Sequence, residues 1–136
     1  MSPKLIILVE NDANLCQSIA LILQRAGYIV TATDCVYKAL EIVPTANYNL
    51  LISDVNIPET TNVLLPKIHT DYPHLPVVIL TDQSSAEADR ESKQYGAHFL
   101  VKPVAPERLL DSVGSIMRNK NHTNQINNHG LPVERF

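Results

Sequence analysis

Residues 5–12 read LIILVEND, and this stretch decides the fold. Its first five residues are all apolar, which is typical of a parallel strand that is covered on both faces. Three polar residues follow at once, namely Glu10, Asn11 and Asp12. Asp12 is a good N-cap for a helix whose apolar stripe ends near Gly27, a residue that commonly terminates helices. A buried strand that runs straight into a helix predicts the first half of a βαβ unit.

The same alternation of apolar runs and amphipathic stretches repeats along the chain. The pattern predicts further strands over residues 28–33, 50–53, 77–80 and 98–101, and further helices over residues 36–43, 62–71, 86–95 and 106–118. Thr31 and Thr33 give the second strand a more polar face and indicate an edge position. Repeated βα units imply right-handed crossovers and a parallel sheet with helices on both faces. A ferredoxin-like α+β fold is the main alternative at this length, but it needs hairpins that the sequence does not signal.

Length and composition predict one globular domain. The chain has 136 residues, of which 45% are hydrophobic, so it can bury a single core. We expect the folded domain to occupy residues 1–118. Residues 119–136 are rich in Asn and lack periodicity, so we expect them to form a flexible tail or linker. The apolar runs are too short to span a membrane, and the first residues do not resemble a signal peptide.

Charge and cysteine content exclude several classes of function. The net charge is −3, which argues against direct nucleic-acid binding by this domain because such a surface needs a basic patch. Only two cysteines occur, without CxxC spacing, so neither a disulfide framework nor a structural zinc site is expected. The four glycines are too far apart to form a phosphate-binding loop. We therefore expect a cytoplasmic protein without a nucleotide cofactor.

Polar side chains stand where the predicted strands end. Glu10 follows the first strand, Asp54 the third, Thr81 the fourth and Lys102 the fifth. Functional sites of open parallel sheets form beyond the carboxyl ends of the strands, so we expect these groups to meet at one edge. A carboxylate can act as a nucleophile in phosphoryl transfer, and a divalent cation with an ammonium group can stabilise the charge on the transferred group.

Four stretches together resemble the receiver domain of bacterial two-component response regulators. They are LIILVEND at residues 5–12, LLISDVNIP at 50–58, VVILTD at 77–82 and FLVKP at 99–103, and the resemblance covers residues 4–118. It implies a flavodoxin-like (βα)5 fold of the α/β class, with a doubly wound, five-stranded parallel sheet in the order 2-1-3-4-5. It also implies a signalling module and not an enzyme.

The resemblance assigns a role to each residue of the expected site. Asp54 would accept a phosphoryl group from a partner histidine kinase or phosphotransfer protein. Thr81 and Lys102 would contact the phosphoryl oxygens. The magnesium ligands would be Glu10, Asn11, Asp54 and the backbone carbonyl of Asn56.

The resemblance also implies a switch. Thr81 and Phe99 would change position on phosphorylation, although the residues themselves favour a plain core role for Phe99. A cis peptide bond would join Lys102 to Pro103. The switch would act on the surface formed by the fourth helix, fifth strand and fifth helix, which could bind a target or form a homodimer.

Three residues depart from the family pattern. Asn11 stands where a second acidic metal ligand is usual. Loss of one charge at about 4 Å is worth roughly 1–4 kcal/mol, so Mg²⁺ would bind about five- to several-hundred-fold more weakly. The residue after the switch threonine is usually small, whereas Asp82 would crowd and repel an incoming phosphoryl group. Asn62 replaces a glycine that is usual before the third helix.

These departures leave two alternative functions open. A degenerate receiver would act as a phosphorylation-independent protein-binding adaptor, and Asn11 and Asp82 support that reading. A small phosphatase with an aspartyl-phosphate intermediate is a weaker alternative. Such enzymes usually carry an Asp-x-Asp pair and a capping domain, whereas the run here is Asp54-Val55-Asn56.

Overall fold

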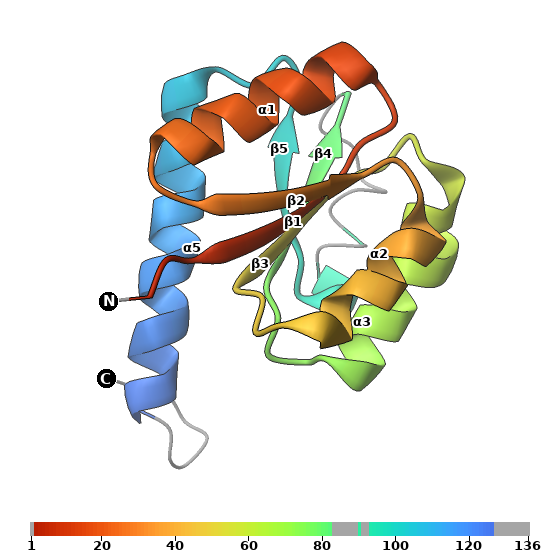
Figure 1. The fold of residues 1–136 in the computed structure, drawn as a ribbon. Coiled ribbons are helices and arrows are strands. Elements are labelled where there is room, and N and C mark those ends of the chain that lie inside the picture. The colour runs from red at the N-terminus through yellow and green to blue at the C-terminus, as the bar shows by residue number, and fades with distance from the viewer. Residues whose placement is uncertain (1, 83–89, 91–92, 127–136) are drawn as a thin grey trace.

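The chain forms an α/β fold around one five-stranded parallel sheet (Figure 1). The structure is a computed structural model that describes residues 2–82, 90 and 93–126. The strands are β1 (Leu5–Val9), β2 (Ile29–Thr33), β3 (Leu50–Asp54), β4 (Val77–Thr81) and β5 (His98–Val101). Their order is β2-β1-β3-β4-β5, which confirms the predicted flavodoxin-like topology and the edge position of β2.

Helices cover both faces of this sheet. They are α1 (Ala13–Arg25), α2 (Val36–Ile42), α3 (Leu65–Asp71) and α5 (Pro106–Ile126). Figure 1 shows α1 and α5 on one face and α2 and α3 on the other. Side chains alternate along a strand, so Ile6 and Leu8 pack toward α1 and α5, while Ile7 and Val9 pack toward α2 and α3. The apolar run of β1 is therefore explained by burial on both faces.

The predicted boundaries of α1 are confirmed by its capping contacts. The Oδ1 atom of Asp12 accepts a hydrogen bond from the backbone N–H of Leu15 at 3.1 Å. Gly27 follows the helix with a φ of 100°, a conformation that residues with a Cβ atom rarely adopt. The chain then turns directly into β2.

Two other helices differ from the sequence prediction at their ends. The helix predicted over 36–43 ends at Ile42 and tightens into a 3₁₀ turn over Val43–Thr45, where Pro44 has no N–H to donate. The helix predicted from Asn62 begins instead with a π-helical turn over Thr60–Leu64. Pro66 stands in the first turn of α3, where its missing N–H and bulky ring are tolerated.

The prediction was also wrong about the end of the last helix. We expected it to stop at residue 118, but α5 continues to Ile126. Residues 119–126 contain neither Gly nor Pro, so nothing in them forces the helix to end when its apolar stripe stops. Residues 127–136 of the expected tail lie outside the described residues. So does most of the helix predicted over 86–95, of which residues 90 and 93–95 are described as helical.

No helix within the described part of the chain has the length and apolar character needed to cross a membrane.

Candidate functional site

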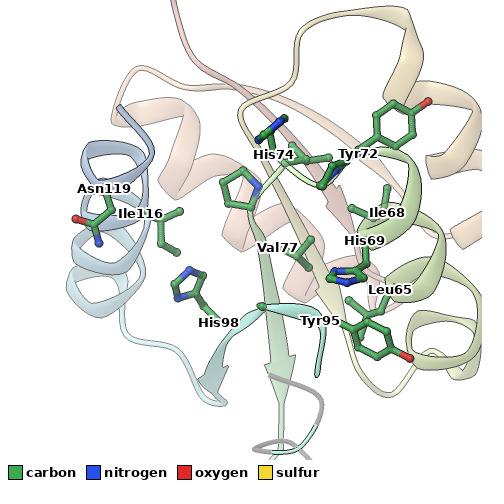
Figure 2. Close-up of a pocket in the computed structure, with 14 residues that line it drawn as sticks. Leu65, Ile68, His69, Tyr72, His74, Val77, Tyr95, His98, Ile116 and Asn119 are labelled. Carbon is green, nitrogen blue, oxygen red and sulfur yellow. The ribbon is translucent and has the colours of Figure 1, made fainter. Parts of the chain in front are cut away.

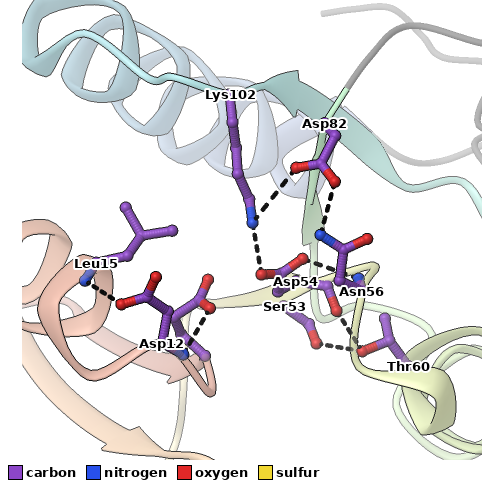
Figure 3. A network of polar contacts seen from close by, with 9 residues as sticks. Asp12, Leu15, Ser53, Asp54, Asn56, Thr60, Asp82 and Lys102 are labelled. Atoms are coloured by element: carbon purple, nitrogen blue, oxygen red, sulfur yellow. Dashed lines mark hydrogen bonds and ion pairs between the residues drawn. The ribbon is translucent and has the colours of Figure 1, made fainter.

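Polar residues from three strand ends lie close together at the carboxyl edge of the sheet, where Lys102 contacts Asp54 (Figure 3) and Glu10 neighbours Asp54; we call this cluster the pocket. Asp54 is the last residue of β3 and Thr81 is the last residue of β4, while Glu10 and Lys102 directly follow β1 and β5. Asp54 and Glu10 are each only 2% exposed, and Thr81 is 7% exposed. The strand ladders place these ends side by side, because Val9 pairs with Ser53 and Asp54 pairs with Leu80.

Both oxygens of the Asp54 carboxylate are engaged by donors. The Lys102 Nζ atom donates to Oδ2 at 2.6 Å, and the backbone N–H of Asn56 donates to Oδ1 at 2.8 Å. The backbone N–H of Lys102 donates in turn to the carbonyl of Thr81 at 2.7 Å, which ties the end of β5 to the end of β4. A buried carboxylate is thus held in a fixed orientation against a partly buried ammonium group.

Glu10 is buried and only one of its two carboxyl oxygens has a hydrogen-bond partner among the described residues. Its Oε2 atom accepts a hydrogen bond from the backbone N–H of Asp12 at 3.1 Å. Its Oε1 atom is buried and has no hydrogen-bond partner among the residues that the structure describes. Burial raises the pKa of the Glu10 carboxyl to about 7 against the opposing effect of the Asp12 amide, and the neighbouring Asp54 carboxylate adds to the rise.

Lys102 remains charged in this setting. Burial alone would lower the pKa of its ammonium group, but the hydrogen bond to Asp54 and the negative charges of Asp54, Glu10 and Asp82 outweigh that effect. The pKa of Lys102 is therefore raised above its ordinary value. The pocket therefore combines the ammonium group of Lys102 with two buried carboxyl groups, Asp54 and Glu10. The raised pKa of Glu10 means that burial favours its protonated form.

The donor set fits a small divalent cation with oxygen ligands. In the described part of the chain, no group of three or more His, Cys, Asp and Glu side chains is placed to hold a metal. Mg²⁺ needs fewer, since it is usually held by one or two carboxylates with water and phosphate oxygens. Such a cation would give the Oε1 atom of Glu10 the partner that it lacks among the described residues. It would also balance the negative charge of the nearby Asp54 carboxylate. Asn11 is exposed in the loop after β1.

Sequence reasoning missed a pair of buried hydroxyl groups beneath the pocket. The Thr60 hydroxyl donates to the backbone carbonyl of Asp54 at 2.8 Å, and the Ser53 and Thr60 hydroxyl oxygens lie 2.8 Å apart. Both residues are fully buried. Because the Thr60 hydrogen is used on Asp54, the Ser53 hydroxyl donates to Thr60. The available signal was Ser53 itself, a polar residue inside an otherwise apolar strand.

A second unexpected contact lies at the mouth of the pocket (Figure 3). The side-chain amide of Asn56 donates to Asp82 Oδ2 at 2.9 Å. The other oxygen of Asp82, Oδ1, lies 3.9 Å from Lys102 Nζ. We call this contact the Asn56–Asp82 bridge. It joins the loops after β3 and β4 above Asp54.

The remaining expected site residues are also placed. Phe99 is half-buried on β5 and packs against the core on the side of α2 and α3. The peptide bond between Lys102 and Pro103 is cis, as the resemblance implied.

A separate hollow of about 370 Å³ lies at the opposite end of the sheet (Figure 2). Val77 and His98, which begin β4 and β5, line it, together with His69 and His74. The His69 ring packs edge-on against Tyr95, with the ring centroids 5.7 Å apart. The histidines had no predicted role, and nothing in the geometry of this hollow links it to Asp54.

Comparisons with known proteins agree with this architecture. The family model described as response regulator receiver domain matches residues 6–114. The chain is similar to the response regulator protein FleR of Pseudomonas aeruginosa, with 36% identity over 110 residues that cover 79% of this chain and 23% of FleR. More generally, it spans between 23% and 56% of the length of the first curated relatives that it matches.

Solved structures show the same likeness. The chemotaxis protein CheY4 of Vibrio cholerae has a TM-score of 0.78 and 30% identity, and the match covers 85% of this chain and 99% of that one. A CheY-like receiver domain protein from Methanospirillum hungatei has a TM-score of 0.81 and 28% identity, over 88% of this chain and 98% of that one.

Proposed function

The chain belongs to the response regulator receiver domain family of two-component signalling, and from that premise we propose that Asp54 is its phosphoryl acceptor. The donor would be the phosphohistidine of a histidine kinase or of a phosphotransfer protein. One observation carries the proposal: Asp54 is buried, fixed by two donors, and paired with Lys102 at 2.6 Å. A carboxylate held in this way has the orientation and the neighbouring positive charge that phosphoryl transfer requires.

Asp54, Lys102 and Thr81 would each have a different role in the transfer. A carboxylate oxygen of Asp54 forms a bond to phosphorus while the bond from phosphorus to the donor imidazole nitrogen breaks, and that nitrogen keeps the electron pair. Lys102 neutralises negative charge on the transferred group. Thr81, buried at the end of β4, would donate its hydroxyl to a phosphoryl oxygen after transfer.

Mg²⁺ would complete the site. Glu10, Asp54 and the backbone carbonyl of Asn56 would hold it, and Asn11 would contribute through its amide oxygen. The ion would neutralise charge on the phosphoryl oxygens. Since Asn11 lacks a charge that an acid would supply, we expect weak Mg²⁺ binding that Asn11→Asp strengthens by about five-fold or more.

The output would be a change at the surface around β5 and α5. Movement of Thr81 toward the phosphoryl group would alter the packing around Phe99, which lies on the adjacent strand. This surface would bind a downstream target or a second copy of the chain. The energy would come from contacts to the phosphoryl group that favour one of two existing conformations.

The test is incubation with acetyl phosphate and Mg²⁺, followed by intact-mass spectrometry. We expect one phosphoryl adduct on the parent chain and none on Asp54→Asn, which keeps the size of the side chain but removes the nucleophile. An adduct that persists in Asp54→Asn would refute the assignment of Asp54. Absence of any adduct over a wide range of Mg²⁺ concentration would favour the phosphorylation-independent adaptor.

A further inference from the structure

The Asn56–Asp82 bridge places a fixed negative charge at the mouth of the phosphorylation pocket. We propose that Asp82, anchored by Asn56, is a specificity-determining residue that slows phosphoryl transfer from small, highly charged donors. The inference rests on the proposed function of Asp54. It adds a residue that limits which phosphoryl donors the pocket accepts.

The two oxygens of Asp82 lie near different partners. One oxygen accepts the amide of Asn56 at 2.9 Å, so the carboxylate is held across the two loops that border the pocket. The other lies 3.9 Å from Lys102 Nζ, the ammonium group that also pairs with Asp54. Figure 3 shows Asp82 and Asp54 converging on Lys102. Lys102 is thus already shared between two carboxylates when a donor arrives.

This arrangement opposes an incoming phosphoryl group in two ways. The group carries negative charge and must approach Lys102, where the charge of Asp82 repels it. It must also displace Asp82 or share the ammonium group with it. The Asp82 side chain is 65% exposed, so water weakens the repulsion. One unit charge at about 4 Å in water corresponds to a factor of about five in rate.

The experiment compares phosphorylation rates of the parent, Asp82→Asn, Asp82→Ala and Asn56→Ala with Mg²⁺ present. The donors are acetyl phosphate, a dianion at neutral pH, and phosphoramidate, a monoanion. With either donor an Asp54 oxygen forms the new bond to phosphorus. The donor O–P or N–P bond breaks, and its electron pair leaves with acetate or, from the nitrogen-protonated phosphoramidate, with neutral ammonia. Intact-mass spectrometry follows the adduct, and Asp111→Asn on α5 is the control for loss of an exposed charge.

We expect Asp82→Asn and Asp82→Ala to react with acetyl phosphate about five-fold faster than the parent, with a smaller gain for phosphoramidate. The gain should shrink as ionic strength rises, since the charge is exposed. Asn56→Ala should give a partial gain because it releases Asp82 without removing its charge. Asp111→Asn should react at the parent rate.

Asp82→Asn separates charge from size, since it keeps the shape and an oxygen that can accept from Asn56. If it reacts at the parent rate while an Asp54-dependent adduct forms, the inference is overturned and the proposed function stands. A gain confined to Asp82→Ala would show that bulk limits the rate and would also overturn it. Absence of an adduct in every variant, including Asp82→Ala, would overturn the proposed function itself.

Discussion

Glu10 makes the stability of this chain depend on pH in a direction that is unusual for a carboxyl group. Its pKa is raised from 4.5 to about 7, chiefly by burial and then by the nearby Asp54 charge, against the effect of the Asp12 amide. Below about pH 4.5, Glu10 is protonated in both the folded and the unfolded chain. As pH rises toward about 7, the unfolded chain loses this proton first, so proton release favours unfolding.

The magnitude follows from the shift. At ~1.4 kcal/mol per pH unit, a rise from 4.5 to about 7 corresponds to a loss of about 3 kcal/mol of unfolding free energy across that window. Replacement of Glu10 by Gln removes the ionisation but keeps an oxygen that can accept from Asp12. We therefore expect Glu10→Gln to match the parent at low pH and to be more stable than the parent above about pH 7.

Urea unfolding in the presence of EDTA, repeated across this pH range, measures the effect. Glu41→Gln, which changes an exposed carboxylate on α2, is the matched control. Its unfolding free energy should depend on pH in the same way as that of the parent. Equal pH dependence of the Glu10→Gln and parent proteins would show that Glu10 is not the group responsible.

Four further changes test other contacts. Saturating Mg²⁺ above about pH 7 should raise the midpoint of thermal unfolding of the parent but not of Glu10→Gln, because a bound cation balances the charge of Glu10. Equal shifts of the two midpoints in differential scanning calorimetry would contradict the metal assignment. Lys102→Met should lower the unfolding free energy by about 2 kcal/mol because the buried Asp54 carboxylate loses its cationic partner, and adding Asp54→Asn should restore most of that loss in urea unfolding. Thr60→Val should destabilise by about 1–3 kcal/mol because Ser53 and the Asp54 carbonyl lose their partner, whereas Thr60→Ser should lose less. Asp12→Ala should remove about 1 kcal/mol by deleting the N-cap of α1, and Asp12→Ser should retain most of it; a similar loss in both variants would argue against capping.

Elements with a strong local signal were predictable from the sequence. The five apolar runs gave the strands, and residues 5–9 alternate between the two faces of the sheet, as a doubly covered strand must. Asp12 and Gly27 marked the ends of α1 because capping is a local property of the chain. The end of α5 was not predictable in the same way. Residues 119–126 have no apolar stripe to require a helix and no Gly or Pro to prevent one.

The convergence of Asp54, Thr81 and Lys102 follows from topology, because residues that end parallel strands meet at one edge. The contacts that refine this pocket depend on loop geometry, which the sequence does not display. Asn56 and Asp82 are 26 positions apart and meet only because β3 and β4 are neighbours. Thr60 reaches the Asp54 carbonyl from a π-helical turn, a shape that no short pattern specifies.

The pocket has a floor of buried strand ends and a border of exposed loop residues, and these two parts should tolerate substitution differently. Substitutions of Asp54 or Glu10 change groups that are 2% exposed, so they should alter the free energy of unfolding as well as any chemistry of the pocket. Asn56 and Asp82 are exposed, so they can be exchanged with little effect on the native state. If Asp54 is the phosphoryl acceptor that we propose, exchanges at these two loop positions would change the rate of phosphoryl transfer while leaving the scaffold intact.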